Sequence, residues 1–498
     1  TNQKPITHAV NVHERCKKEI EYAVLTQWFV NILDHKDTFI ALADEIKWYP
    51  AFMKSRYINW VQNVKWDWCI SRQRFYGIPF PVWHCADCKQ ILLPDEKDLP
   101  IDPQETAYHA KQCSACNSTN IVPDTDVMDT WNTSSITPYI CYNLFSKKED
   151  PFSKEALEFI PMGMRPQAHD IIRTWAFYTI IKSWMHSKTI PWKEIVISGH
   201  VLSSEKEKIS KSKGNNPLDP ESLLQANSAD VIRYWTASGS LGHDVSFSET
   251  QLKIGQKLVT KLWNAFIFSE PHLDGFIPKT TPQKLGIVNE WLLDRISTVF
   301  KKYQAYFEKH EFGLALQAIE EFFWADFCDN YLELIKNQLF NPENYTTDEV
   351  YATKWTLHSI GLRILQLYAP YLPYVTETIY QELYKKQVGT DSIHQTKFET
   401  VQLPYHFEQA TATMQAIIEI VSQVRKLKTN LQLSLKTPLA TLTIASENAH
   451  AQELRKHEQL LKGVTQAEII TSMSPSEKES ELIQKDDTWH AIIYLKMQ

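Results

Sequence analysis

The chain has 498 residues, 43% of them hydrophobic and 12% aromatic, which is enough for several domains with buried cores and excludes a disordered protein. The formal net charge is -7, with 52 basic and 59 acidic side chains. This balance excludes a generally basic nucleic-acid coat but permits a local positive stripe. No apolar run is long enough for a signal peptide or a bilayer span, so we expect a cytoplasmic protein without a membrane partner.

The N-terminal segment mixes short apolar runs with charged turns. The run YAVLTQWFVNIL is typical of this segment, and residues 1–60 therefore predict mixed helix and strand. His13 and Cys16, in VNVHERC, have the spacing of half a zinc site. Alone, this pair is more typical of an ordinary surface.

Residues 61–160 are rich in aromatic residues, proline, cysteine and aspartate, which indicates an irregular region. Two Cys-x-x-Cys pairs lie within it, separated by residues 89–112. Two such pairs can place four thiolates at the corners of a tetrahedron, the geometry that zinc prefers. Sulfur fills every ligand position, so we expect a structural zinc site; two disulfides or four unrelated thiols are the alternatives. The predicted ligands are Cys85, Cys88, Cys113 and Cys116.

A predicted α/β layer leads to a lysine-rich loop. HDIIRTWAFYTIIKSW predicts a buried helix, and EIVISGHVL predicts a short strand that enters EKEKISKSKGNNPLDP at 205–220. Lysine ammonium groups on flexible stems can follow a phosphate as its geometry changes, so a polyphosphate would suit this loop. From the residues alone, a solvated charged surface is an equally good interpretation.

Beyond about residue 249 the pattern becomes helical. Apolar residues recur every three or four positions, which predicts a helical bundle. The two clearest stripes are Leu292, Ile296, Val299, Tyr303 and Phe307, followed by Leu316, Ile319, Phe323 and Phe327. Prolines in YAPYLPYVTETIYQEL interrupt the bundle, and Thr376 is the expected cap of the next helix.

The C-terminal region changes pattern again. LATLTIA and QAEIITS predict strands, and ENAHAQELRKHEQLLK between them predicts a helix. Residues 431–498 are therefore expected to form a small α/β appendage.

The lysine loop carries a motif. KISKS at 208–212, followed by KGN, resembles the KMSKS signature of class I aminoacyl-tRNA synthetases, with Ile209 in place of Met. WDWCISRQRFYGIPFPVW at 66–83 resembles the run that enters the zinc-bearing insertion of the valine, isoleucine and leucine enzymes. DVMDTWNTSS at 126–135 and RPQAHDIIRTWAF at 165–177 resemble the pocket segments of the valine enzymes, and FCDNYLELIK at 327–336 their anticodon-binding bundle.

This resemblance covers nearly the whole chain and weakens past about residue 440. It implies a partial Rossmann-like catalytic layer with a zinc-ribbon insertion at about 80–120, then an all-α anticodon-binding bundle, then the α/β appendage. Residues 1–60 would be the exit from an editing insertion and the return to the catalytic domain. Residues 61–248 would be the second half of that domain, and 249–430 the helical stem and bundle.

The family's His-x-Gly-His motif, HIGH, is absent from the sequence, and residue 1 is Thr. We therefore expect a C-terminal part that lacks the first half of the catalytic domain and most of the editing domain. Family enzymes join an amino-acid carboxylate to the α-phosphate of ATP, then pass the acyl group to the terminal ribose of tRNA. The implied partners are valine, ATP with Mg²⁺, tRNA(Val) and the missing N-terminal half.

The resemblance also implies roles for single residues in the ATP site. Lys208 and Lys211 match the motif lysines and are expected to hold the β- and γ-phosphates of ATP, with Ser210 and Ser212 beside them. Lys206 and Lys213 lie outside the motif and are expected to be solvated. His169 and Asp170 belong to the same ATP site, where Asp170 matches the acid that holds the ribose.

The amino-acid pocket is implied at Trp131, Ile171 and Trp175, and the spacing of the last two puts them on one helix face. Asp129 is expected either to bind the substrate ammonium or to order its own loop. Ala168 stands where relatives commonly have Gly, so its methyl group would approach ATP. Asn132 replaces a usually apolar residue.

Two other readings of the sequence are kept. In the first, the chain is a stand-alone tRNA-binding module that uses the bundle and its cluster Arg425, Lys426 and Lys428 without chemistry. In the second, it belongs to an isoleucine enzyme, against which the DTW and HDIIRTW segments argue.

RNA contact is expected along the junction of the bundle and the catalytic layer. One face of a predicted helix there carries cations four residues apart. A solvated charged face explains these cations equally well. These cations are Lys253, Lys257 and Lys261.

Overall fold

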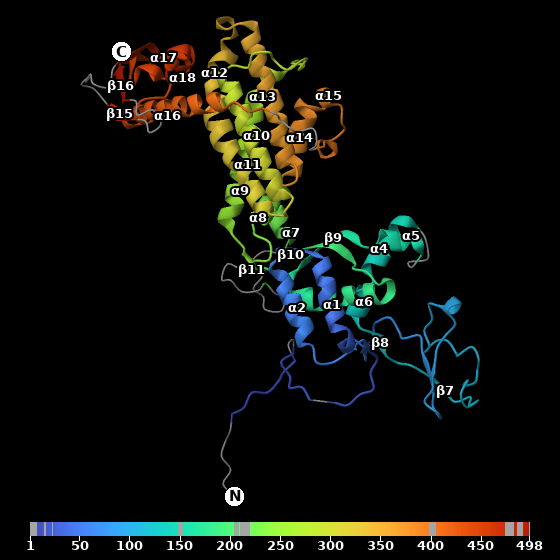
Figure 1. The fold of residues 1–498 in the computed structure, drawn as a ribbon. Coiled ribbons are helices and arrows are strands. Elements are labelled where there is room, and N and C mark those ends of the chain that lie inside the picture. Colours follow the sequence, from blue (N-terminus) through green and yellow to red (C-terminus); the bar gives the residue numbers. More distant parts are fainter. Residues whose placement is uncertain are drawn as a thin grey trace. The chain divides into compact units, whose positions relative to one another are not determined.

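The computed structural model describes residues 7–13, 16–21, 23–147, 153–203, 209, 220–397, 405–473, 483–485 and 492–497. The chain divides into two compact units. The first unit contains residues 1–217 and 241–247, and the second contains residues 218–240 and 248–498 (Figure 1).

A parallel sheet forms the centre of the first unit. Its strands are β2 (Lys47–Tyr49), β10 (Trp192–Ser198) and β9 (Met162–Ala168), in the order β2-β10-β9. Helices α1 (Lys36–Glu45), α2 (Met53–Asn63) and α6 (Phe177–Ser187) share its core. Strand β10 is largely apolar and its Ile195 is fully buried, as expected of a parallel strand covered on both faces. The α/β layer predicted from the sequence is confirmed.

The segment between β9 and α6 differs from the single helix that the sequence predicts. It begins as the 3₁₀-helix η3 (His169–Ile171) and continues as the π-helical turn η4 (Ile172–Ala176). The N–H of Phe177 donates to the carbonyl of Ile172, five residues earlier, and this bond widens the turn. Ile171 and Trp175 therefore lie on consecutive elements, not on one α-helix.

Short antiparallel pairs complete the first unit. Strand β1 (Phe29–Val30) pairs with β3 (Trp68–Cys69), and β4 (Ser71–Arg72) pairs with β8 (Val127–Met128). A three-stranded ribbon consists of β6 (Ile91–Leu92), β5 (Trp83–Cys85) and β7 (Ile121–Pro123), in that order. Three short helices follow: α3 (Thr130–Ser134), α4 (Thr137–Ser146) and α5 (Lys154–Phe159).

The second unit is a helical bundle followed by a small α/β region. The bundle helices are α7 (Pro220–Ala226), α8 (Ala229–Ala237), α9 (Glu249–Leu273), α10 (Ile287–Phe307), α11 (Phe312–Glu321), the π-helix η6 (Phe322–Tyr331), α12 (Leu332–Phe340), α13 (Thr347–Tyr368), α14 (Pro373–Leu383), α15 (Lys385–Val388) and α16 (Glu408–Asn430). Both apolar stripes predicted from the sequence lie in its core, except that Phe307 is only partly buried.

The predicted cap of α14 is wrong. Thr376 lies inside this helix, where its hydroxyl donates to the carbonyl of Leu372 at 2.8 Å. The helix begins at Pro373 instead, because proline lacks an N–H and its fixed φ suits a first helical position.

The C-terminal region has the predicted α/β character. Strands β13 (Leu439–Ala445), β14 (Ala467–Met473), β15 (Ile483–Lys485) and β16 (Ile492–Met497) form a sheet in the order β14-β13-β16-β15. The predicted helix is divided at His457 into α17 (Asn448–Lys456) and α18 (Glu458–Thr465).

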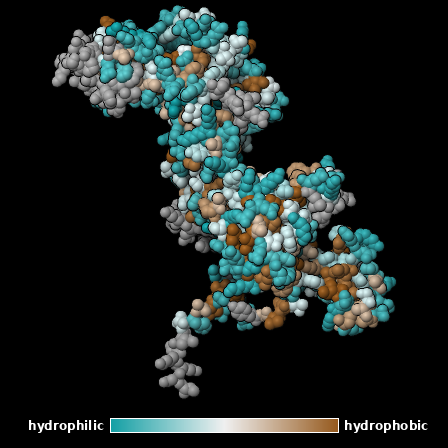
Figure 2. All heavy atoms as spheres, viewed as in Figure 1, coloured by the Kyte–Doolittle hydropathy of each residue, from teal (hydrophilic) through white to brown (hydrophobic). Residues whose placement is uncertain are grey.

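The surfaces of the two units are mixed in character. Hydrophilic residues cover much of the bundle face seen in Figure 2, whereas the first unit shows several hydrophobic areas. Phe75 and Tyr76 of the first unit are 92% and 84% exposed. None of the helices in the described ranges combines the length and hydrophobicity that crossing a membrane would require.

Candidate functional site

Two polar segments meet at the carboxyl end of the parallel sheet. His169 and Asp170 directly follow β9, and His200 follows β10. The rings of His169 and His200 stand edge to face with centroids 4.5 Å apart, and Nε2 of His200 lies 3.9 Å from Oδ2 of Asp170. Ligands of open α/β sheets bind at this end of the strands. The structure thus brings the predicted ATP-site residues His169 and Asp170, which are neighbours in the sequence, together with His200.

The predicted phosphate-binding residues Lys208, Ser210, Lys211 and Ser212, and the flanking Lys206 and Lys213, lie outside the described residues. The described chain approaches them through β11 (Val201–Leu202), which pairs in parallel with β12 (Val245–Ser246).

The two tryptophans of the predicted pocket lie on elements that pack together. Trp131 is on α3 and Trp175 is on η4, and the two elements are in contact. Nε1 of Trp175 donates to the carbonyl of Ser134 at 3.1 Å, which fixes the indole against the end of α3. Trp131, Ile171 and Trp175 are all half-buried, so each keeps an exposed part.

A buried arginine that the sequence did not reveal supports one of these tryptophans. The guanidinium carbon of Arg165, on β9, lies 3.1 Å from the ring centroid of Trp175. Arg165 is 8% exposed, and burial lowers its pKa to about 10. The cation–π contact therefore covers one face of the indole. Asn132 is also buried beside this region, and Ala168 is the half-buried last residue of β9.

Asp129 is buried and forms an ion pair with Arg72. Nη2 of Arg72 lies 3.2 Å from Oδ1 of Asp129, while Oδ2 has no hydrogen-bond partner among the described residues. The pairing of β4 with β8 brings the two residues together. The ion pair of Oδ1 with Arg72 agrees with a role in ordering the loop. Because Oδ2 is itself buried, contact with the substrate ammonium stays a prediction.

The four predicted zinc ligands form one cluster. Their sulfur atoms all lie within 4.8 Å of one another, with Cys85 3.6 Å from Cys116 and Cys88 3.5 Å from Cys113. Sulfurs at about 2.3 Å from a tetrahedral zinc ion are roughly 3.8 Å apart, so the donor set fits this metal. All four cysteines are free of disulfides, which excludes that alternative in this structure.

The two cysteine turns repeat one backbone design. The N–H of Cys85 donates to the carbonyl of Gln90, and the N–H of Lys89 returns to the carbonyl of Cys85. The second turn, from Cys113 to Ser118, makes the same two hydrogen bonds. In the first turn, a backbone hydrogen bond from Cys88 is the largest of the effects that lower the pKa of the Cys85 thiol to about 6. Burial and hydrogen bonds from the neighbouring thiols instead raise the pKa of Cys88 and of Cys116.

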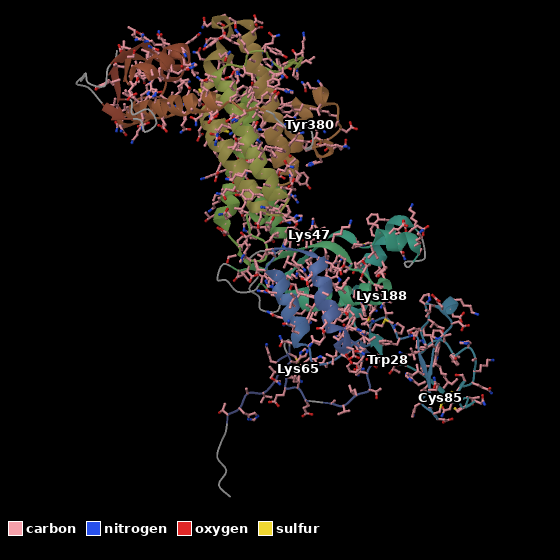
Figure 3. All side chains as sticks on the ribbon, in the orientation of Figure 1. Trp28, Lys47, Lys65, Cys85, Lys188 and Tyr380 are labelled. Atoms are coloured by element: carbon pink, nitrogen blue, oxygen red, sulfur yellow. The ribbon has the colours of Figure 1, made fainter. Side chains whose placement is uncertain are left out.

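A carboxylate at the base of the ribbon was also missed by the sequence analysis. Oδ2 of Asp124 lies 2.9 Å from Nε1 of Trp28 and 2.9 Å from Nε2 of His84. The contact joins the N-terminal segment to the ribbon that carries Cys85, and Figure 3 labels Trp28 and Cys85. The partners are too far apart in the sequence for any local pattern to reveal them.

His13 and Cys16 lie together at the surface, with Nδ1 of His13 3.3 Å from the Cys16 sulfur. Within the described ranges, the four-cysteine cluster is the one group with metal-ligand geometry, and this pair is not part of it.

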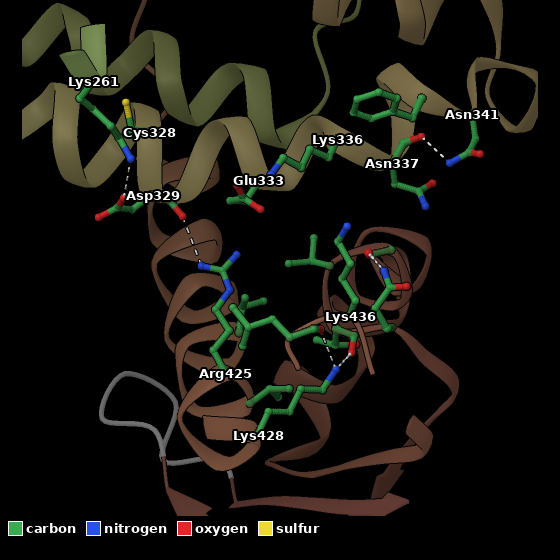
Figure 4. A pocket seen from close by; sticks show the side chains of 18 residues that line it. Lys261, Cys328, Asp329, Glu333, Lys336, Asn337, Asn341, Arg425, Lys428 and Lys436 are labelled. Atoms are coloured by element: carbon green, nitrogen blue, oxygen red, sulfur yellow. Dashed lines mark hydrogen bonds and ion pairs between the residues drawn. The ribbon is translucent and has the colours of Figure 1, made fainter. Parts of the chain in front are cut away.

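The bundle unit contains a groove of about 730 Å³ between the bundle and the C-terminal region. Its lining includes Lys261, Lys336, Arg425 and Lys436, opposed by two acidic residues (Figure 4). The ammonium of Lys261 is 3.7 Å from Oδ1 of Asp329, and Nη1 of Arg425 donates to the carbonyl of that residue at 3.2 Å. Lys336 likewise pairs with Glu333. The two acidic residues thus compensate two of the four cations, and Arg425 and Lys436 leave the groove with a positive balance that suits an anion.

The predicted basic clusters divide into exposed and buried members. Lys253 and Lys257 are exposed on α9, Lys261 is half-buried at the groove, and Lys426 is exposed on α16. Lys428 is 1% exposed, because its ammonium donates to the carbonyls of Leu435, Thr437 and Thr465 (Figure 4). The RNA contact that the binding-module alternative assigned to Lys428 is therefore wrong. A buried cation surrounded by carbonyls stabilises the fold instead.

Comparison with known proteins gives two matching family models. Residues 5–248 match tRNA synthetases class I (I, L, M and V), and residues 289–444 match the anticodon-binding domain of tRNA ligase. Among similar proteins, the valine–tRNA ligase of Rickettsia felis is 38% identical over 94% of this chain and 54% of its own length. That of Ehrlichia ruminantium (strain Welgevonden) is 40% identical over 90% and 53%. The chain spans about half the length of these curated relatives.

Solved structures show the same fold. Mycobacterium tuberculosis methionyl-tRNA synthetase in complex with methionyl-adenylate has a TM-score of 0.54 at 16% identity, covering 77% of this chain and 69% of that one. The Agrobacterium radiobacter K84 LeuRS–tRNA–LeuAMS complex has a TM-score of 0.50 at 18% identity, covering 70% and 43%. The predicted combination of a Rossmann-like catalytic layer with a helical anticodon-binding domain is confirmed.

Proposed function

Because this chain belongs to the class I tRNA synthetases, we propose that it supplies the lysine-loop half of the catalytic domain and the anticodon-binding bundle of a valine–tRNA ligase. The identity of 37–40% to several proteins named valine–tRNA ligase, over at least 90% of the chain, is the observation that carries this proposal. The enzyme would be complete only with the part of its relatives' length that this chain does not span.

The proposed reaction proceeds in two steps. The carboxylate of valine attacks the α-phosphate of ATP and releases pyrophosphate, and the 3′-terminal ribose of tRNA then attacks the acyl carbon and releases AMP. No covalent bond to the protein forms, so the chain has only to position its substrates and stabilise developing charge. Lys208 and Lys211 would compensate the charge of the departing pyrophosphate.

The described residues support assignments for the two small substrates. His169 and Asp170 stand at the strand ends where a nucleotide is expected, and the exposed carboxylate of Asp170 is suited to hydrogen-bond a ribose. Trp131 and Trp175 supply aromatic walls for a short branched side chain, with Arg165 holding the second wall from behind. The second oxygen of Asp129 is buried, so a hydrogen bond to it from the substrate ammonium would require this loop to open.

The groove of the second unit supports tRNA as the macromolecular partner. Lys261, Lys336, Arg425 and Lys436 present positive charge to a concave surface, and Lys253 and Lys257 extend it along α9. Phosphate contacts of this kind position an RNA without reading its sequence.

We assign a structural zinc ion to Cys85, Cys88, Cys113 and Cys116. It would cross-link the two cysteine turns and take no part in the reaction, because four thiolates leave no coordination position for substrate. Mg²⁺ would accompany ATP as part of the substrate.

The proposal is tested by replacing Lys211 with Ala in the enzyme completed by its first half. Valine-dependent exchange of pyrophosphate into ATP should slow by about 100-fold or more, because one charge-stabilising donor is lost, whereas tRNA affinity should change little. Lys213→Ala is the matched control and should exchange at nearly the normal rate. Equal losses of exchange and tRNA binding would identify the loop as an RNA contact. Wild-type protein that binds tRNA without any exchange would favour a binding module.

A further inference from the structure

A short strap, defined as residues 241–247, crosses the carboxyl end of β10 and belongs to the first unit. The N–H of Gly242 donates to the carbonyl of Ile197 at 2.8 Å, and the N–H of Val245 donates to the carbonyl of His200 at 2.8 Å. These two hydrogen bonds hold the strap against the end of β10, one before and one at the end of the turn at residues 199–200 that leads into β11.

The strap and this turn are in backbone contact. A Cβ atom built on Gly199 would lie 1.9 Å from the carbonyl oxygen of His243, so no larger residue fits without moving one of the two chains. Gly242 has a φ of +74°, a conformation that L side chains rarely adopt, and a Cβ there would meet Pro50 and Phe52. Both glycines thus allow the strap to approach closely enough to place its side chains over the sheet end.

One carboxylate on the strap joins the two polar segments of the candidate ATP site. Oδ1 of Asp244 lies 2.8 Å from Nε2 of His169 and accepts the backbone N–H of His200 at 2.7 Å. A carboxylate only accepts hydrogen bonds when ionised, so this contact places a proton on Nε2 of His169. Hydrogen bonds from His200 and then from His169 lower the pKa of Asp244, in agreement with an ionised group.

The N–H that donates to Asp244 belongs to the root of the lysine loop, defined as residues 200–203. His200 directly precedes β11 (Val201–Leu202), and the described chain continues only to Ser203 before that loop. The pairing of β11 with β12 fixes this root to the strap itself. Movement of the strap would therefore move both the histidine after β9 and the start of the loop.

We propose that Asp244 is a positioning residue: through one oxygen it sets the ring orientation of His169 and the backbone of His200, and so fixes the His-Asp segment relative to the root of the lysine loop. Asp244 contacts neither substrate in this account and acts through His169 and the loop. The catalytic consequence rests on the proposed function, but the contact itself does not.

Two measurements test this proposal, and the first needs only this chain. With ¹⁵N-labelled histidine, the ring signals of His169, identified by their loss in His169→Gln, should report a proton on Nε2. Asp244→Ala should shift this ring toward a mixture of tautomers, and Asp244→Asn, which keeps an acceptor of the same shape, should do so less. An unchanged His169 spectrum in Asp244→Ala overturns the proposal.

The second measurement uses the enzyme completed by its first half. Asp244→Ala should raise the KM for ATP in valine-dependent pyrophosphate exchange about tenfold and change the KM for valine less than about twofold. If Asp244 only stabilised the fold, Asp244→Ala would lower the fraction of active enzyme without raising the KM for ATP above that for valine. Asp44→Asn is the control, since Asp44 pairs with Lys54 on the helical surface. Normal ATP kinetics in Asp244→Ala overturn the positioning role, whereas an inactive wild type refutes the proposed function and leaves the tautomer result standing.

Discussion

The ribbon of β6, β5 and β7, with its two cysteine turns, is stabilised differently from the helical bundle. The ribbon has strands of two or three residues and a small core. Within the described ranges, the buried members of this core are Trp83, Cys85, Leu92 and Cys113, with Ile101, Tyr108 and Ile121 partly buried against them. The bundle core runs continuously from α8 to the C-terminal sheet. A segment with so little apolar surface to bury needs a cross-link to hold it, whereas the bundle folds on hydrophobic burial. The two regions should therefore respond to different perturbations.

The largest effect is expected on removing the metal from the ribbon. The double variant Cys85→Ser/Cys113→Ser should lose a binding free energy of about 10 kcal/mol or more and unfold the ribbon. Hydrogen exchange should then become fast in residues 83–123 and remain slow in α10 and α13. Zinc content should fall from about one per chain to near zero. Unchanged protection of the ribbon, or wild-type protein without zinc, would show that another interaction holds it.

The bundle should instead be destabilised by substitutions in its hydrophobic core. Phe323 is fully buried on η6, so Phe323→Ala should lower the free energy of unfolding by about 3–5 kcal/mol through lost burial and a cavity. The urea midpoint of the bundle, followed by circular dichroism, measures the loss. Phe340→Ala, at a residue that is 62% exposed, is the matched control and should cost less than about 1 kcal/mol. Similar costs for both would mean that the bundle core is not what holds this unit.

A buried histidine makes the bundle sensitive to acid in a defined range. Burial between the rings of Phe276 and Tyr384 lowers the pKa of His358 to about 4. The unfolded chain therefore binds the proton first, at a pKa of about 6.5, and stability is lost as the pH falls from there toward 4. By linkage, the free energy of unfolding should be about 2 kcal/mol lower at pH 5 than at pH 8.

The measurement is a series of urea midpoints between pH 8 and pH 5. His358→Gln should remove most of the slope in this range, because glutamine does not titrate. If the variant keeps the full slope, a different group binds the proton.

The smallest effect on stability is expected at the exposed face of α9. Lys257→Ala should change the free energy of unfolding by less than about 0.5 kcal/mol. It should nevertheless weaken tRNA binding and lower the slope of log affinity against log salt by about one unit, because one phosphate contact is lost. Binding titrations with tRNA at several salt concentrations measure this slope, and an unaltered slope would mark Lys257 as a solvated residue.

The sequence predicted what depends on local spacing. The cysteine pairs, the stripe from Leu292 to Tyr303 and the strand LATLTIA each follow from a fixed period or a short motif, and the structure contains all three. The catalytic layer and the helical anticodon-binding domain, which are confirmed, followed from motif order, whereas the zinc-ribbon insertion stays a prediction. The roles assigned within the lysine loop stay predictions, since these residues lie outside the described ranges.

What the sequence did not reveal depends on partners brought together by the fold. Asp244 meets His169 from 75 positions away, and Asp124 meets Trp28 from 96. No local pattern encodes such contacts. Lys428 shows the same limit, because a lysine near the end of an amphipathic helix looks solvent-exposed until the carbonyls that surround it are known. The π-helical turn at Ile172–Ala176 was missed because its residues fit an ordinary helical period.

The central claim is that this chain is part of a valine–tRNA ligase. The most direct test is aminoacylation of tRNA by the chain joined to its first half, with labelled valine, isoleucine and threonine supplied separately. The account predicts stable attachment of valine to tRNA(Val), with isoleucine attached far more slowly. Preferential attachment of isoleucine, or no attachment of any amino acid by a folded and zinc-loaded protein, would contradict it.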